Sequence, residues 1–293
     1  MRKRICIIHN PASGGSGRQR LDGVINELRQ AGAHVEEIET AGPGDGRTRA
    51  RAAAASQQFD LIVAAGGDGT VHDVAGGLIG GNCPLGIIPT GTGNVFAREL
   101  GLGFAPAGLA RNLLSGPARK IPVGEVNGQP FLFVGGVGFD AAVLKFFEAA
   151  NHRWLGRAGF VAPVLRALSS ASDLSLRVLL DGVEYEANWI IVTRIKRYAA
   201  DFLLAPEADM RNEQLSVALF SGSGIFARMR QLAAIGCGLL AHVPGVTITS
   251  CRHLTIEGES SVPVQIDGEV KGQLPLELGV HRLRLPVITP AHG

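Results

Sequence analysis

The sequence Gly66-Gly67-Asp68-Gly69-Thr70 lies between an apolar run and a segment with helical periodicity. Residues 59–65 have the composition of a buried strand, and the apolar residues after the cluster recur at i, i+3, i+4 and i+7, as on one helix face: Val71, Val74, Ala75 and Leu78. Glycine permits positive φ and leaves backbone N–H groups open to an anion at a helix N-terminus. The cluster therefore predicts a strand-to-helix turn that binds phosphate, although such turns also occur with an Asp or Thr cap and no ligand.

Three further units of strand, loop and helix flank this turn. Their loops follow the strands directly, are rich in Gly, Ser, Thr or Asn, and comprise residues 10–17, 41–46 and 89–94. Strands that alternate with helices predict a parallel sheet with right-handed crossovers. Because ligands bind outside the carboxyl ends of such strands, we expect Asn10, Thr40 and residues 90–94 to converge with residues 66–70 on one crevice. The alternative is that all four loops are ordinary solvent-exposed turns.

The best-known nucleotide fingerprints fit poorly. The chain has no G-x-x-x-x-G-K-[ST] motif, which argues against a P-loop NTPase. Gly91-Thr92-Gly93 begins like G-x-G-x-x-G, but Phe96 stands where the third glycine belongs. A dinucleotide-binding fold is therefore disfavoured.

After about Val123 the hydrophobic pattern changes to period 2. Alternating runs flank three dipeptides that are typical of hairpin turns: Asn127-Gly128, Asp181-Gly182 and Asp267-Gly268. We therefore expect an α/β domain over residues 1–123, followed by a mostly antiparallel β-sandwich over residues 124–293. Two helical stretches are expected near 141–170 and 225–243, and the closing strand, 282–287, is a candidate to return to the first domain.

The composition describes a globular protein, with 46% hydrophobic and 18% charged residues among 293 and a net charge of +2. So small a charge gives no indication of a nucleic-acid partner. The four cysteines, Cys6, Cys83, Cys237 and Cys251, are widely spaced, which argues against a zinc site or disulfide framework and suits a reducing cytosol. No window reaches the roughly 18 apolar residues of a membrane-spanning helix. We expect a cytoplasmic protein, peripheral at the inner face of the membrane at most.

Several of these segments carry a resemblance. They are Asn10-Pro11 with Ser13-Gly14, residues 66–70, residues 85–94, residues 135–140 and Ile266-Asp267-Gly268-Glu269. In this order they resemble the diacylglycerol kinase catalytic domain family, soluble bacterial lipid kinases related to sphingosine and ceramide kinases. G-G-D-G-T alone also occurs in NAD kinases and phosphofructokinases. The P-x-G-T-x-N loop at 89–94, together with the late D-G-E, favours the lipid kinases.

The resemblance implies ATP-dependent phosphorylation of a lipid hydroxyl, on a diacylglycerol-like or sphingoid acceptor, with the nucleotide in an interdomain cleft and Mg²⁺ present. It implies that Glu269 is the proton acceptor. The positions that fall on nucleotide contacts of the family are Asn10, Thr40, Gly66, Gly67, Asp68, Gly69, Thr70, Val71, His72 and Thr92. Thr92 and Asn94 would offer hydroxyl and amide hydrogen bonds to phosphate or nucleotide, with turn and cap chemistry as the alternative.

Two carboxylates are the candidate catalytic groups. Asp68 cannot neutralise phosphate itself, so we expect it to hold Mg²⁺ directly or through water. The alternative is an N-cap for a helix that starts at Thr70. Glu269 would accept the proton of the attacking hydroxyl, and the alternative is a solvated strand residue. Asp267 is expected to serve only the turn.

The chain departs from the family pattern at two places. Relatives often carry Asp-Gly in the segment 205–216, where it contributes to a magnesium site, whereas this chain has Asn212-Glu213, with Ser216 where an acid is common. This argues against the second-domain magnesium site near Asn212 and Leu215. Tyr198-Ala199-Ala200 replaces Tyr-Gly-Gly and predicts a stiffer loop.

Lipid access would require a surface for transient contact with the membrane. Aromatic and apolar residues alternate with basic ones over 145–166: Phe146, Phe147, Trp154, Leu155, Phe160 and Val161 beside Lys145, His152, Arg153, Arg157 and Arg166. A second apolar face, beside Arg228 and Arg230, comprises Leu232, Ile235, Leu239, Leu240 and Val243. These are candidates for a membrane-facing surface, and burial against the β domain is the alternative. The sequence leaves a homodimer open.

The leading interpretation is a lipid kinase with ATP and a lipid as partners. A soluble-substrate kinase similar to NAD kinases is supported only by residues 66–70. A non-catalytic, nucleotide-binding regulatory protein is suggested by the altered segment 211–216, but the intact Asp68 and Glu269 count against it.

Overall fold

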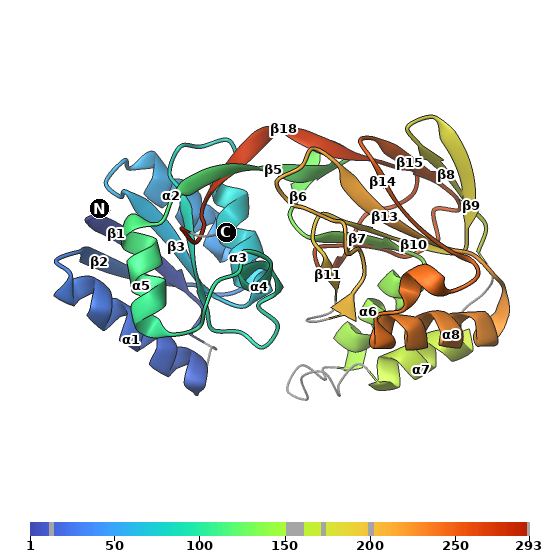
Figure 1. Cartoon of the computed structure of the whole chain (residues 1–293), viewed down its shortest axis with the longest axis horizontal. Helices are drawn as coiled ribbons and strands as arrows, with labels where there is room; N and C mark the ends of the chain where they lie inside the picture. The colour runs from blue at the N-terminus through green and yellow to red at the C-terminus, as the bar shows by residue number, and fades with distance from the viewer. Residues whose placement is uncertain (12–14, 151–160, 171–173, 199–201, 292–293) are drawn as a thin grey trace. The chain divides into compact units, whose positions relative to one another are not determined.

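The computed structural model describes residues 1–11, 15–150, 161–170, 174–198 and 202–291 (Figure 1). The chain folds into two compact units. Unit 1 comprises Met1–Val123 and Arg282–Gly293, and unit 2 comprises Gly124–His281.

Unit 1 is an α/β domain around a parallel sheet in the order β2-β1-β3-β4. Figure 1 shows α1 and α5 over one face of this sheet and α2 and α3 over the other. The elements are β1 (Arg4–His9), α1 (Ser16–Gln30), β2 (His34–Glu39), α2 (Asp45–Ala55), β3 (Leu61–Gly66), α3 (Asp68–Leu78), β4 (Leu85–Pro89), α4 (Val95–Glu99) and α5 (Pro106–Ser115). The predicted parallel α/β domain is confirmed.

The central strands are apolar along their whole length because helices cover both faces of the sheet. Every residue of β3 and β4 is buried. The predicted strand 59–65 begins two residues later than expected, at Leu61. Asp60 lies before the strand, and its carboxylate accepts the backbone N–H groups of Lys3 and Arg4, both at 2.9 Å.

Unit 2 contains the predicted antiparallel β-sandwich. One sheet has the order β14-β13-β10-β7-β16-β17, and the other includes β18, β15, β8 and β9, with β5 and β6 beside β18. The strands are β5 (Ala118–Val126), β6 (Gln129–Phe131), β7 (Val134–Val137), β8 (Leu176–Leu180), β9 (Val183–Ala187), β10 (Trp189–Thr193), β13 (Leu215–Phe220), β14 (Val246–Cys251), β15 (Leu254–Glu257), β16 (Val264–Ile266), β17 (Glu269–Val270) and β18 (Leu276–Ile288). The short strands β11 (Arg197–Tyr198) and β12 (Phe202–Leu203) pair with each other.

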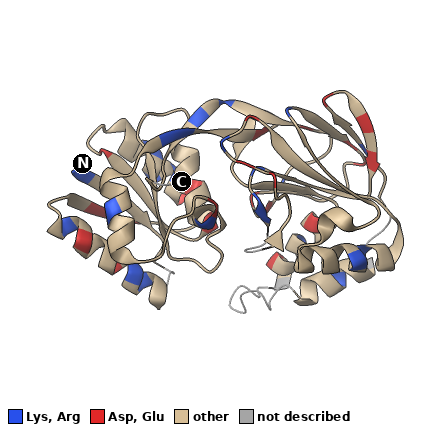
Figure 2. Cartoon of the chain, in the orientation of Figure 1, with Lys and Arg blue, Asp and Glu red and all other residues tan. Residues whose placement is uncertain are grey.

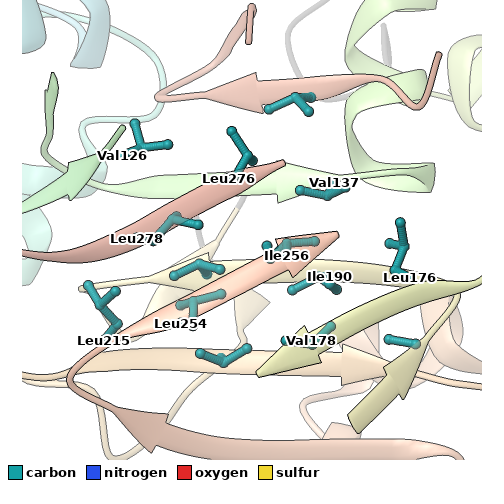
Figure 3. Close-up of a cluster of buried hydrophobic side chains, with 14 of the residues drawn as sticks. Val126, Val137, Leu176, Val178, Ile190, Leu215, Leu254, Ile256, Leu276 and Leu278 are labelled. Atoms are coloured by element: carbon teal, nitrogen blue, oxygen red, sulfur yellow. The ribbon is translucent and has the colours of Figure 1, made fainter. Parts of the chain in front are cut away.

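The core of the sandwich is formed by alternate residues of both sheets (Figure 3). Leu176, Val178 and Leu254 come from one sheet, and Val137 and Ile190 come from the other. Because side chains alternate across a strand, the intervening residues of β10 and β13 point to the opposite face of their sheet. The strand β18 pairs with β15 at its start and with β4 at Val287.

All three predicted hairpin turns are present. Each has positive φ at both central residues, which is the requirement of a type I′ turn: Asn127 (46°) and Gly128 (76°), Asp181 (45°) and Gly182 (88°), and Asp267 (51°) and Gly268 (83°). The flanking residues pair as expected, including Ile266 with Glu269. The turn chemistry therefore fixes the register of the strand that carries Glu269.

Three helices pack on the outer face of the six-stranded sheet around Trp189, which stacks on Phe220 and meets Phe139 edge to face. They are α6 (Phe139–Ala150), α7 (Val161–Ser170) and α8 (Gly224–Cys237). The first predicted helical stretch is thus two helices, with residues 151–160 outside the described part. The predicted burial of the 232–243 face is confirmed for Leu232, Ile235, Leu240 and Val243, and Leu239 is exposed.

Candidate active site

The loops singled out in unit 1 meet at one edge of its sheet. The parallel register places His9 opposite Glu39 and Ala65, and Gly66 opposite Pro89, so the four strands end together. Backbone bonds join the residues that follow: Asn10 N–H to Ala65 O (3.3 Å), Thr40 N–H to His9 O (2.9 Å) and Thr90 N–H to Gly66 O (3.0 Å). The structure therefore brings Asn10, Thr40, residues 66–70 and residues 90–94 together.

The two glycine loops touch backbone to backbone. A Cβ atom on Gly91 would lie 2.4 Å from the Cα of Gly67, and one on Gly66 would lie 2.3 Å from the Cβ and Oγ1 of Thr70. Real Cβ contacts are never so short, so these positions require glycine for packing alone. A Cβ on Gly17 would lie 2.5 Å from Thr90 O, so α1 also begins against this edge.

The helix α3 begins at this edge with N–H groups directed out of its end. Its hydrogen-bond pattern starts with Val71 N–H to Gly67 O at 3.1 Å. The N–H groups of Gly69 and Thr70 precede that bond and belong to the unsatisfied first turn of a helix. Gly69 is exposed, and no atom lies within 4 Å of the place of its Cβ. This helix end can therefore receive phosphate oxygens.

Asp68 does not act as the N-cap that was the alternative to a magnesium ligand. The helix starts at Asp68 itself, with Gly67 at the N-cap, so the interpretation as a cap for a helix starting at Thr70 is wrong. Its Oδ1 instead accepts the N–H of Phe96 at 3.2 Å, in the first turn of α4. Burial raises the pKa of Asp68, and N–H donors at residues 94–96 oppose that rise. The carboxylate thus ties the first glycine loop to the second.

Asn94 uses both ends of its side-chain amide inside its own loop. Its Oδ1 accepts Gly91 N–H at 3.0 Å, and its Nδ2 donates to Gly91 O at 2.6 Å. The residue is buried and has a left-handed φ of 49°. Its side chain therefore shapes the loop, whereas the neighbouring Thr92 is exposed and offers its hydroxyl outward.

Val71 and His72 lie on the packed side of α3. Both are buried, and His72 Nε2 lies 3.2 Å from Nη2 of Arg47 on α2. Thr40 Oγ1 lies 3.4 Å from His9 O. The side chains of Val71, His72 and Thr40, three of the predicted nucleotide contacts, therefore make contacts within the protein itself.

Arg20 is a neighbour of the loop 89–94 that the sequence did not reveal. It donates to Pro89 O at 2.5 Å and to Phe104 O at 3.1 Å, and its guanidinium lies 5.1 Å from the centre of the Phe104 ring. These contacts place a positive charge beside the second glycine loop. A single arginine inside a helix carries no sequence signal for that role.

Glu269 stands in unit 2 at the first position after the Asp267-Gly268 turn. It is exposed, and its Oε2 lies 2.8 Å from Nζ of Lys271. Asp267 does more than form the turn: its carboxylate accepts the N–H groups of Leu132 (2.7 Å), Phe133 (2.7 Å) and Val134 (3.0 Å). The turn that carries Glu269 is thereby fastened to the loop between β6 and β7.

In the segment near Asn212 and Leu215, the positive charge comes from an arginine side chain of the protein. Arg194 is 1% exposed, and its guanidinium donates to Met210 O (2.7 Å), Asn212 O (2.9 Å) and Gln214 O (3.2 Å). Asp209, the nearby acid, is paired with Arg211 at 2.9 Å. These residues do not fit a magnesium ion, because the guanidinium occupies the carbonyl oxygens that would coordinate it.

Asp68 remains the candidate ligand for the catalytic ion. Among the residues that the structure describes, no group of three or more His, Cys, Asp or Glu could hold a metal. Mg²⁺ at kinase sites is commonly held by one or two carboxylates together with substrate phosphates and water. A single carboxylate at the phosphate-facing edge fits that donor set.

Both units match known families. Residues 4–126 match the family model described as "Diacylglycerol kinase catalytic domain", and residues 134–289 match "YegS C-terminal NAD kinase beta sandwich-like domain". The chain belongs to the diacylglycerol kinase family. It is therefore a kinase, a phosphotransferase with an alcohol group as acceptor, and the family implies ATP as phosphoryl donor.

Similar proteins cover almost the whole chain. The diacylglycerol kinase of Mycobacterium tuberculosis (strain ATCC 25618 / H37Rv) is 31% identical over 99% of this chain and 96% of the relative. That of Bacillus subtilis (strain 168) is 29% identical over 94% of this chain and 92% of the relative. A solved diacylglycerol kinase from Bacillus anthracis str. Sterne superposes with a TM-score of 0.75 at 20% identity, covering 99% of this chain and 98% of that one. At 20% identity, this last similarity shows a shared fold only.

No helix in the described part of the chain is both long and apolar enough to span a bilayer.

Gly91→Ala tests the contact between the two glycine loops. The added methyl group would overlap the Gly67 backbone, so we expect the free energy of unfolding to fall by about 1–3 kcal/mol. Gly108→Ala is the matched control, because Gly108 is exposed on α5 and no atom lies within 4 Å of the place of its Cβ. It should be neutral or stabilising in urea unfolding. Equal stability of the two variants would contradict the close contact.

Arg194→Met tests the resident cation. Removing the guanidinium leaves buried carbonyl oxygens without that donor, so we expect a loss of about 3 kcal/mol or more. Thermal unfolding should show the loss with and without millimolar Mg²⁺. Restoration of the melting temperature by Mg²⁺ would show that the loop can bind the ion after all.

Proposed function

We propose that this protein is an ATP-dependent lipid kinase that transfers the γ-phosphoryl group to the hydroxyl of a diacylglycerol-like or sphingoid acceptor. The observation that carries the proposal is the convergence of residues 66–70 and 90–94 at one sheet edge, with Asp68 joining them. The whole-length similarity to diacylglycerol kinases supports a lipid acceptor.

Unit 1 would position the donor. Phosphoryl transfer depends mainly on placing the reactants and on neutralising phosphate charge. Gly69 and Thr70 offer N–H groups at the start of α3, Thr92 offers an exposed hydroxyl, and Arg20 adds a positive charge beside Pro89. The glycine contacts hold these groups in a fixed arrangement, so little ordering is needed when nucleotide binds.

Asp68 would hold Mg²⁺ directly or through water. When bound, the ion would neutralise charge on the donor phosphates. Its N–H donors from α4 keep the Asp68 carboxylate in place. The side chain therefore has a fixed orientation before the ion arrives.

Glu269 would accept the proton of the attacking hydroxyl. The acceptor oxygen forms a bond to the γ-phosphorus, the bond from that phosphorus to the leaving oxygen of ADP breaks, and the hydroxyl proton passes to Glu269. Glu269 is exposed, and its Oε2 lies 2.8 Å from Nζ of Lys271, so its carboxylate is accessible to the hydroxyl of an acceptor.

A soluble-substrate kinase similar to NAD kinases is the second candidate. The observation that favours it is the match of residues 134–289 to a family described by its NAD kinase-like sandwich. A non-catalytic nucleotide-binding protein is the third, and the altered segment 211–216 was its only support. Arg194 binds main-chain carbonyl oxygens of the neighbouring segment 210–214, so that segment has a structural role in the fold, and Asp68 and Glu269 count against the third candidate.

An assay with γ-labelled ATP, Mg²⁺ and a panel of diacylglycerol, sphingosine, ceramide, phosphatidylglycerol and NAD separates these candidates. We expect label in the organic phase, with kcat reduced about 10²- to 10⁴-fold in Glu269→Gln. Glu186→Gln, which changes another exposed carboxylate of unit 2, should behave like the wild type. Label on NAD, or on no acceptor, would refute the lipid kinase.

We further propose that α7, α8 and β12 form the surface for transient peripheral contact with the membrane. Large apolar side chains are exposed there: Phe226 (84%), Leu165 (62%), Val161 (61%), Met229 (51%), Ile225 (43%), Phe202 (37%) and Leu203 (37%). The helix α8 contacts both α7 and β12, so these side chains belong to one region of unit 2. On α8 the exposed residues are Ile225, Phe226 and Met229, which differ from the residues predicted from sequence. The other candidate segment predicted from sequence was 145–166. Its Phe146 packs against the buried cluster around Trp189, and its residues 152–155, 157 and 160 lie outside the described part.

The charges of this surface match an anionic membrane. Neither α7 nor α8 contains Asp or Glu, and both carry arginine (Figure 2). Arg166 and Arg230 are exposed. Apolar side chains flanked by basic ones are typical of surfaces that insert among lipid headgroups.

The double variant Leu165→Ser/Phe226→Ser tests this surface. Both side chains are exposed, so the fold should persist while binding to vesicles of phosphatidylglycerol and diacylglycerol weakens about 10-fold or more in sedimentation. Val183→Ser, at a residue 56% exposed on β9, is the control. Unchanged vesicle binding would contradict the proposal, and dissociation of a dimer in light scattering would instead identify a self-association surface.

A further inference from the structure

A buried carboxylate lies behind the turn that carries Glu269. Asp140, in the first turn of α6, is 5% exposed. The hydroxyl of Tyr198 donates to its Oδ1, and Nε2 of Gln265 donates to its Oδ2 at 2.8 Å. Burial raises the pKa of Asp140, and the two donors oppose that rise. Both carboxylate oxygens are thus occupied by side chains from other parts of unit 2.

Gln265 connects this carboxylate to the turn. Its Oε1 accepts the backbone N–H of Gly268 at 3.0 Å. A backbone N–H can only donate, so Oε1 must face Gly268 and Nε2 must face Asp140. The orientation of the Gln265 amide is therefore determined, and Oδ2 of Asp140 accepts its hydrogen bond.

The neighbouring strand, β7, leaves space for the side chains of Asp140 and Gln265. Gly136 of β7 lies opposite Gln265 in the sheet. A Cβ atom on Gly136 would lie 1.7 Å from Oδ2 of Asp140 and 2.9 Å from Nε2 of Gln265. Only glycine leaves room at this position for the carboxylate and the amide to meet.

A buried carboxylate is a poor source of net stability, because its desolvation offsets much of what its hydrogen bonds contribute. What the network does supply is a fixed position for one backbone amide, that of the residue immediately before Glu269. Asp267 fastens the same turn through the amides of residues 132–134. The turn is thereby held at two successive residues by two separate carboxylates.

We propose that Asp140, acting through Gln265, is a positioning residue that fixes the Asp267-Gly268-Glu269 turn and so the placement of the Glu269 carboxylate. This inference rests on the proposed role of Glu269 as proton acceptor. Asp140 itself has no part in the proposed reaction, and its role is to hold the turn in place.

An exchange of the two side chains is the sharpest test. In Asp140→Asn/Gln265→Glu, the new amide at position 140 can donate to the new carboxylate at position 265, and that carboxylate can also accept Gly268 N–H. The hydroxyl of Tyr198 can donate to the amide oxygen at position 140, so each bond keeps a donor and an acceptor. Gln265→Glu alone places two carboxylates together, and Gln265→Leu removes the acceptor for Gly268. The matched surface control is Gln273→Leu, at an exposed residue after β17.

We expect Gln265→Glu and Gln265→Leu to lower kcat on the order of 10- to 100-fold, at a temperature where each remains folded, with KM for ATP unchanged. The exchanged double variant should recover most of kcat. In a Glu269→Gln background, adding Gln265→Leu should leave the residual rate unchanged, because the amide acts only through Glu269. Failure of the double variant to recover, or an undiminished effect in the Glu269→Gln background, would overturn the inference.

Hydrogen exchange at the Gly268 amide separates this inference from the proposed function. We expect slow exchange in the wild type and the double variant, and at least about 10-fold faster exchange in Gln265→Leu. If exchange responds in this way while Glu269→Gln keeps full activity, the tether is real, the assigned catalytic role of Glu269 is wrong, and positioning for catalysis falls with it. If Gln265→Leu leaves exchange unchanged, the tether is absent whatever the activity.

Discussion

The close approach of two backbones, at Gly67 and Gly91, is the constraint on which the proposed donor site depends. A Cβ on Gly91 would lie 2.4 Å from the Gly67 Cα, whereas one on Gly67 would lie 3.5 Å from the Gly91 Cα, so the loops after β3 and β4 can meet because residue 91 carries no side chain. Asp68 then spans the contact to Phe96, and Asn94 closes its own loop on Gly91. Gly91 permits this packing, and the exposed Gly69 leaves the start of α3 open to the phosphate that we propose binds there.

In unit 2, Glu269, the proposed proton acceptor, is held in place by different interactions. Its type I′ turn sets the register of β17, and the carboxylate of Asp267 and the amide of Gln265 hold the turn itself. The loop 210–214 is organised around the Arg194 guanidinium. Charged groups inside this unit therefore act on main-chain amides and carbonyls, which positions loops without requiring a bound ion.

Periodicity and turn chemistry predicted the architecture because they are local. The alternation around Asp267-Gly268 gave the hairpin, and the spacing of Val71 to Leu78 gave α3. The bond from Asp68 to Phe96 could not be predicted, because Phe96 is 28 residues away and belongs to another loop. Arg194 and Arg20 carried no signal, since their hydrogen-bond partners are main-chain groups that only the folded chain brings near them. Asp140 lies in the segment 135–140 that carries the resemblance, but its partners Tyr198 and Gln265 are far away in the sequence, so its contacts could not be predicted. The exposed face of α8 was missed because an apolar helix shows no clear polar side.

The central claim, that the two glycine loops together hold the donor phosphates, is tested most directly by hydrogen exchange with and without Mg²⁺ and ATP. Nucleotide should slow exchange at the amides of residues 69–70 and 92–93 simultaneously, and ADP should protect them less than ATP. The amide of Gly91, already bonded to Asn94 at 3.0 Å, should change little. Protection confined to one loop, or protection elsewhere with both loops unchanged, would contradict the claim.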